Sequence, residues 1–175
     1  TSEVRAMVAL TERHFPLVLE ELTGLSAGLD LPFEDVFLWN CRGDVWAMAA
    51  DGCTTVQLPL EHGARIAHNE DGDPAFKGYC AIAQVSVVGG LDFASFVYPA
   101  SIPGHTFAVN EAGLAMTVNN LRSREVKMGL PRMALTRALL EQTSLTDAVA
   151  LLSHSPKAGG FHLSLAQQGR VGLHS

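Results

Sequence analysis

Hydrophobic residues in the first 30 positions recur at the spacing of an amphipathic helix. Seven of them fall within an arc of roughly 100° on a helical wheel, as expected for one face packed on a core: Val4, Met7, Val8, Phe15, Val18, Leu22 and Leu25. Pro16 lies inside this segment, and proline lacks the backbone donor that a helix interior needs. We therefore expect a kinked or divided helix whose apolar stripe stays in phase on both sides.

A second, short helix is predicted for residues 33–39, within "GLDLPFEDVFLWN". Asp30 is expected near its cap and Pro32 in its first turn, where proline is tolerated. Glu34 and Asp35 would then lie at the positive end of the helix dipole.

From residue 53 onward the pattern changes to short apolar runs with β-branched residues, separated by turn residues, which predicts antiparallel strands. The runs are "CTTVQLPL", "GARIAHNE", "CAIAQVSVV", "ASFVYPAS", "HTFAVN" and "LAMTVNN". Helical periodicity returns in "PRMALTRALLEQT" and in "SLTDAVALLSH", where Ser144 and Asp147 form a capping arrangement. The final "FHLSLAQQGRVGLHS" predicts a hairpin. The pattern as a whole predicts one α+β domain over residues 1–175.

Composition and charge narrow the classes of partner. The chain has 175 residues, of which 47% are hydrophobic, so it can bury a sizeable core. Twelve Lys and Arg against eighteen Asp and Glu give a net charge of −6, which argues against nucleic acid and anionic membranes as partners. No apolar run approaches the roughly 20 residues of a membrane span. The final strand would form an open sheet edge, which predicts that further chain or a second chain completes the sheet, and a homo-oligomer is left open.

The three cysteines do not form a recognisable disulfide or zinc pattern. Cys41, Cys53 and Cys80 are odd in number and widely spaced, which favours a reducing, cytoplasmic location. Cys41 and Cys80 are expected to be buried small hydrophobes. No glycine-rich phosphate loop and no close histidine pair is present, so neither a cofactor nor a metal is predicted.

Cys53 follows Gly52 and opens a predicted strand, 18 residues before Asp71 in the polar stretch "AHNEDGDPAF". That gap fits one hairpin, which would return the polar stretch to the start of the strand. By spacing alone the stretch is most simply a charged turn. Asn119 and Asn120 end another strand, where paired amides are either turn caps or oxyanion donors.

Four separated segments resemble one known family in its order. The segments "DGCTT", "HNED", "VNEAGLAMTVNNLRS" and "LPRMALTRALLEQTSLTDAVALL" are similar to the acyl-coenzyme A:6-aminopenicillanic acid acyltransferase family. That family is related to the choloylglycine hydrolases and belongs to the N-terminal nucleophile hydrolases. The resemblance implies an αββα sandwich of antiparallel sheets between helices, incomplete at residue 175, with residues 1–52 as a helical pro-segment or small chain and residues 53–175 as the first part of the larger chain.

The resemblance also implies a self-processing cysteine enzyme. Its members cut themselves at a bond that matches Gly52–Cys53, after which Cys53 is an N-terminal nucleophile whose own amine serves as the base. Asp71 matches the residue that orients this amine, and Thr55 matches a supporting threonine. Asn119 matches the oxyanion donor, with Asn120 as the alternative one residue away. The implied reaction is hydrolysis or acyl transfer on a small linear amide or acyl thioester.

Two departures from the family pattern limit what the resemblance says about substrate. His68 stands where the branch that hydrolyses bile salts has an arginine, and Glu70 stands where the penicillin acyltransferase has an aromatic residue. A non-catalytic relative that binds ligands with the Gly52–Cys53 bond intact is the main alternative. A zinc protein that uses Cys53, Cys41 and nearby histidines is a third hypothesis.

Overall fold

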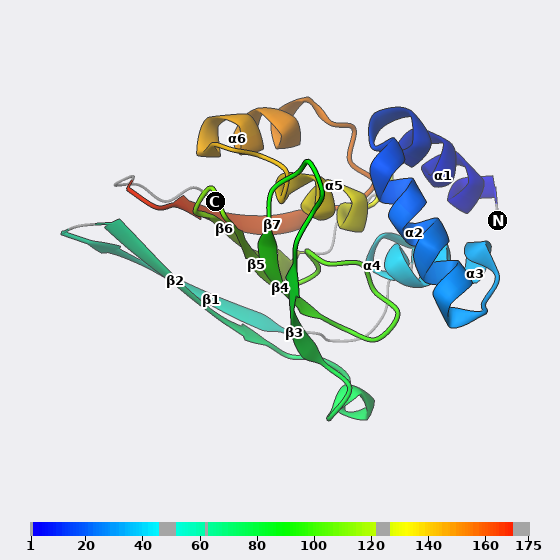
Figure 1. Ribbon diagram of the computed structural model, residues 1–175, viewed down its shortest axis with the longest axis horizontal. Helices are drawn as coiled ribbons and strands as arrows, with labels where there is room; N and C mark the ends of the chain where they lie inside the picture. Colours follow the sequence, from blue (N-terminus) through cyan, green and yellow to red (C-terminus); the bar gives the residue numbers. More distant parts are fainter. Residues whose placement is uncertain (1, 46–51, 62, 122–126, 170–175) are drawn as a thin grey trace.

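A computed structural model describes residues 2–45, 52–61, 63–121 and 127–169 (Figure 1). It has the expected α+β class, with helices packed on antiparallel sheets. The second strand of the predicted C-terminal hairpin falls in residues 170–175 and lies outside the described residues. Among the described residues, no helix has the length and apolar character that crossing a membrane requires.

The N-terminal segment forms two helices that meet at Phe15. Helix α1 (Ser2–His14) ends before it, and α2 (Pro16–Leu29) begins with the proline, as the sequence predicts. All seven residues of the predicted stripe contribute to one core cluster, so the shared apolar face is confirmed. Each helix is short, and this common buried face stabilises both of them.

The start of the third helix differs from the prediction. Asp30 ends α2 in a left-handed conformation, with φ 53° and ψ 44°, and does not cap the helix that follows. Pro32 is the residue before α3 (Phe33–Asn40) and does not lie in its first turn. Asp30 therefore takes a role that glycine usually fills, and Asp is one of the few other residues that tolerate it. A single turn, α4 (Arg42–Val45), follows α3.

In the part of the chain that the structure describes, seven strands form two antiparallel sheets. Strands β1 (Cys53–Leu60) and β2 (Gly63–Glu70) form a hairpin. The other five form a sheet in sequence order: β3 (Ala81–Val85), β4 (Phe93–Val97), β5 (Phe107–Asn110), β6 (Leu114–Asn120) and β7 (Phe161–Gln167). A single 3₁₀ turn at Pro74–Phe76 lies between β2 and β3. Six of these strands follow runs that the sequence predicts, and β7 is the first strand of the predicted C-terminal hairpin.

The elements are arranged in layers (Figure 1). Helices α5 (Arg132–Leu139) and α6 (Leu145–His154) cover one face of the five-stranded sheet, and the β1–β2 hairpin lies on the other face against β6 and β7. Ser144 caps α6 by accepting a hydrogen bond from the Asp147 backbone, as predicted. Helices α1 to α3 pack beside α5 at one end. Within the described ranges no helix covers the outer face of the hairpin, so three of the four expected layers are present.

Asn40, at the end of α3, connects the N-terminal helices to the loop between β4 and β5. Its side chain donates to the carbonyls of Val36 and Ala100 and accepts from the Ile102 backbone N–H. The asparagine is 3% exposed, so each of these polar groups depends on the others for a partner. A second link is the ion pair of Arg137 with Glu21, at 2.7 Å.

Candidate active site

Cys53 is the first residue of β1 and lies on the inner face of the hairpin. Because side chains alternate along a strand, Cys53 and Thr55 share this face. The antiparallel register places Glu70 opposite Cys53 and His68 opposite Thr55. Four polar side chains thus gather between the hairpin and the five-stranded sheet. The expected return of the polar stretch to Cys53 is confirmed, and it results from the pairing of two strands.

Thr55 is the centre of a hydrogen-bond network that joins the two sheets. Its hydroxyl lies 2.6 Å from Asn119 Oδ1, 2.8 Å from His68 Nδ1 and 3.1 Å from Thr117 Oγ1. The Asn119 amide nitrogen in turn donates to the main-chain carbonyl of Cys53, at 2.8 Å. The network therefore connects the residue that opens β1 to the end of β6.

The directions of these hydrogen bonds follow from one constraint. The Cys53 carbonyl can only accept, so the Asn119 side chain must present its nitrogen there and its oxygen to Thr55. Thr55 has one hydroxyl hydrogen, which goes to Asn119 Oδ1. The Thr55 oxygen then accepts from His68, so the ring carries its hydrogen on Nδ1. In neutral His68, the other ring nitrogen, Nε2, is consequently a bare acceptor.

Glu70 is the contact of the Cys53 thiol that sequence reasoning missed. The thiol donates to Glu70 Oε2 at 3.1 Å, and His68 Nε2 lies 3.2 Å from the same oxygen. The other carboxylate oxygen accepts from the Tyr98 hydroxyl at 2.9 Å. From the sequence, Glu70 belonged to the polar stretch and was a departure from the family pattern, but it had no predicted role at the thiol. Its place opposite Cys53 in a one-hairpin register was the signal that could have identified it.

Burial and Glu70 together keep the Cys53 thiol protonated in the uncut chain. Loss of solvent raises its pKa to about 12, and the hydrogen bond to Glu70 and the negative charge of that residue act in the same direction. The Tyr98 pKa is also raised, first by burial and then by the charge of Glu70. A neighbouring base is therefore needed before this thiol can act as a nucleophile.

The main chains of Gly52 and Asp71 contact each other next to Cys53. The Asp71 backbone N–H donates to the Gly52 carbonyl at 3.2 Å. A Cβ at position 52 would lie 3.2 Å from the Asp71 carboxylate, so glycine permits this close approach. Gly72 has a similar role, since a Cβ there would collide with the Tyr98 hydroxyl and displace it from Glu70.

The structure places the other candidate residues from the sequence, Asn120, Cys41 and Cys80, away from the Cys53 thiol or in other roles. Asn120 follows Asn119 on β6, so alternation directs it to the opposite face, and Asn119 is the asparagine beside Cys53. Cys41 is buried in the helical core, as expected, but Cys80 is only partly buried. All three cysteines are free thiols. The zinc hypothesis that pairs Cys53 with Cys41 is not supported, because the potential ligand group found among the described residues is Cys53, His68 and Glu70.

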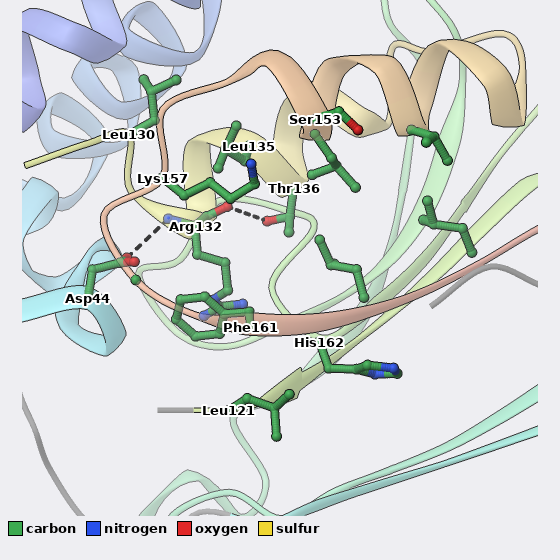
Figure 2. Close-up of a pocket in the computed structure, with 15 residues that line it drawn as sticks. Asp44, Leu121, Leu130, Arg132, Leu135, Thr136, Ser153, Lys157, Phe161 and His162 are labelled. Carbon is green, nitrogen blue, oxygen red and sulfur yellow. Dashed lines mark hydrogen bonds between the residues drawn. The ribbon is translucent and has the colours of Figure 1, made fainter. Parts of the chain in front are cut away.

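An apolar pocket of about 310 Å³ lies on the other face of the five-stranded sheet, away from Cys53 (Figure 2). Helices α5 and α6 and strand β7 form most of its walls. Asp44 lies at its end beside Arg132, whose backbone N–H it accepts, and the Arg132 guanidinium lies over the Phe161 ring. Asp44 is 5% exposed, and its Oδ1 has no hydrogen-bond partner among the described residues.

We predict that Thr55→Val lowers the free energy of unfolding by about 2 to 3 kcal/mol. Valine keeps the shape but removes the hydroxyl that serves three partly buried partners. Chemical denaturation measures the change, and Thr55→Ser should recover most of it. Thr54→Val is the matched control, because Thr54 lies on the exposed face of the same strand and should change stability by less than about 0.5 kcal/mol. Equal effects of the two valine variants would contradict the network.

Asp44 predicts a pH dependence of stability. Burial, only partly opposed by the charge and backbone N–H of Arg132, raises its pKa from 3.8 to about 6. Because the folded state holds this proton more tightly, the stabilisation is complete below about pH 4 and is lost as pH rises through 6. The unfolding free energies of wild type and Asp44→Asn are measured from pH 4 to 7. Over this range the wild type should lose about 2 kcal/mol of stability relative to the variant. A pH-independent difference would contradict the assignment.

Comparison with known proteins shows the family of this chain. A family model for acyl-coenzyme A:6-aminopenicillanic acid acyl-transferase matches residues 60–172. The β-alanyl-dopamine/carcinine hydrolase of Drosophila melanogaster is 25% identical over 159 residues, with 79% of this chain and 41% of that protein covered. The 40 kDa form of acyl-coenzyme A:6-aminopenicillanic-acid-acyltransferase from Emericella nidulans is 28% identical over 150 residues, with 83% and 41% covered. The chain thus spans about two fifths of the length of these relatives. It belongs to the acyl-coenzyme A:6-aminopenicillanic acid acyl-transferase family.

Proposed function

We propose that this chain carries the nucleophile of a self-processing enzyme that hydrolyses amides or transfers acyl groups through an acyl-Cys53 intermediate. One observation carries the proposal, the set of hydrogen bonds around Cys53. Its thiol donates to Glu70, and its main-chain carbonyl accepts from the Asn119 amide. The preceding carbonyl, that of Gly52, accepts from the Asp71 backbone N–H. The names of the two relatives, a hydrolase and an acyltransferase, support the reaction class.

In this proposal the whole protein has the αββα layers of the N-terminal nucleophile hydrolases. Residues 1–52 are the pro-segment or small chain, and residues 53–175 begin the larger chain. The outer face of the hairpin carries exposed apolar side chains, including Val56, Leu58 and Leu60, each more than 40% exposed. Such a face suits cover by a further helical layer. The longer relatives have enough additional chain to provide one.

Self-cleavage begins with the Cys53 thiol in the uncut chain. At this stage the Cys53 nitrogen is an amide and cannot act as a base, so Glu70, already the acceptor of the thiol hydrogen, takes the proton. The sulfur attacks the Gly52 carbonyl carbon, and the developing oxyanion receives the Asp71 backbone N–H. The C–N bond breaks, the Cys53 nitrogen gains a proton, and a thioester joins Gly52 to the sulfur. Water hydrolyses this thioester and leaves a Gly52 carboxylate and a free Cys53 amine.

In turnover the free amine of Cys53 replaces Glu70 as the base. An α-amino group has an ordinary pKa near about 8, so it accepts the thiol proton at neutral pH. Asp71 orients this amine, and Thr55 and His68 support the site through the network. The Asn119 amide nitrogen carries two hydrogens, so one can hold the Cys53 carbonyl while the other stabilises a substrate oxyanion. The proposed substrate is a small linear amide or acyl thioester.

The test is the intact mass of the full-length protein. Wild type should give two fragments separated between Gly52 and Cys53, and Cys53→Ala should give one uncut chain. Glu70→Gln should slow cleavage by about 10²-fold, because it keeps the shape but removes the base. Asp73→Asn is the matched control on the same segment, where the carboxylate only caps a 3₁₀ turn.

Turnover is followed separately with panels of acyl amides and acyl thioesters. Asn119→Ala should lower turnover by about 10² to 10³-fold if the amide serves the oxyanion. An uncut wild-type chain whose Cys53→Ala variant still binds ligand normally would replace the enzyme with a non-catalytic binding relative.

A further inference from the structure

The three side chains that meet at the thiol form a ligand set for a metal ion. Cys53 Sγ, one ring nitrogen of His68 and one carboxylate oxygen of Glu70 all lie within 4.8 Å of one another. Glu70 Oε2 is 3.1 Å from the sulfur and 3.2 Å from the ring nitrogen. Strand pairing holds the arrangement, because Cys53 and Glu70 are opposite each other and His68 shares their face.

The contact between His68 and Glu70 requires a proton or a metal cation between them. The network fixes the His68 hydrogen on Nδ1, so the neutral ring presents its Nε2 lone pair to a carboxylate oxygen. Two acceptors 3.2 Å apart repel unless a cation separates them. The His68 side chain is only 2% exposed and that of Glu70 14%, so water screens the pair weakly. A proton on Nε2 meets this requirement, and so does a metal ion that both atoms bind.

The donor types and spacing suit zinc. Zinc binds thiolate sulfur, imidazole nitrogen and carboxylate oxygen, and tetrahedral geometry places such atoms about 3.3 to 3.6 Å apart. The two separations from Glu70 Oε2, 3.1 Å to the sulfur and 3.2 Å to the ring nitrogen, lie within about half an ångström of these values. Hydrogen bonds from neighbouring residues already orient two of the ligands. The Thr55 hydroxyl bonds to His68 Nδ1, and the Tyr98 hydroxyl donates to Glu70 Oε1. Three protein ligands would leave a fourth position for water.

We propose that Cys53, His68 and Glu70 bind a zinc ion in the uncut chain and that the ion holds the chain in its uncut state. On binding, the Zn–S bond forms as the S–H bond breaks, and the proton leaves to solvent. The sulfur lone pair and the Glu70 carboxylate are then engaged by the metal, so neither nucleophile nor base is available to attack Gly52. This second part rests on the proposed self-cleavage, whereas the binding site does not.

Cobalt(II) tests binding directly, because a cobalt–thiolate bond gives a charge-transfer absorption. Full-length protein purified uncut in the presence of zinc, and then exchanged into cobalt, should bind one cobalt with this band, and added zinc should displace it. Cys53→Ala should abolish the band. His68→Gln and Glu70→Gln should each weaken binding by about 100-fold or more, beyond the usual cost of losing an outer partner. Cys80→Ala is the matched control and should bind as wild type does.

Three results would overturn the site: no one-to-one cobalt binding, a band that survives in Cys53→Ala, or unchanged affinity in both His68→Gln and Glu70→Gln. The last result would assign binding to an N-terminal cysteine chelate of amine and thiolate. Because these readouts need no cleavage, they remain informative if the proposed function fails.

Control of maturation is tested by translating the full-length protein in vitro. Added zinc should raise the uncut fraction several-fold, and a zinc-selective chelator should release cleavage. Glu70→Gln, which already cleaves slowly, should show little further response to zinc. Equal cleavage of the wild type with zinc and with chelator, in a protein that binds cobalt as described, would refute the holding role and leave the metal site.

Discussion

The hydrogen bond from the Asn119 amide to the Cys53 carbonyl is the constraint on which the site depends. It fixes the orientation of the Asn119 side chain, and through it the single hydroxyl hydrogen of Thr55 and the hydrogen on His68 Nδ1. The chain of directed bonds ends at Glu70, which must accommodate a ring nitrogen and a thiol on one oxygen. A contact on the main chain of Cys53 thus determines which ring nitrogen of His68 carries the hydrogen and which one faces Glu70.

The fold makes this arrangement by pairing two sheets. The hairpin supplies the nucleophile, the histidine and the carboxylate in one register, and β6 supplies the amide from the facing sheet. Helices α5 and α6 cover the opposite face of the five-stranded sheet and so support β6 from behind. The N-terminal helices are fastened at the far end by Asn40 and by the Arg137–Glu21 pair. These links would hold the two pieces together if the bond before Cys53 is cut.

Much of the fold was predictable because its signals are local. The stripe of α1 and α2, the break at Pro16 and the Ser144 cap depend on near neighbours in sequence, and each prediction is confirmed. Asp30 was misassigned because an Asp can cap one helix or end the previous one in a left-handed turn, and sequence alone does not choose. Which of Asn119 and Asn120 faces Cys53 can be decided only once the strand register is known. The role of Glu70 was missed because it depends on pairing with Cys53 across the hairpin.

The most direct test of the account is the hydrogen position on the His68 ring in uncut protein, measured by long-range proton–nitrogen NMR. The network predicts a protonated Nδ1 in every state. In the neutral ring, Nε2 should give the signal of an unprotonated or metal-bound nitrogen. A neutral ring with its hydrogen on Nε2 would contradict the account, because Thr55 and Asn119 could not then be directed as described.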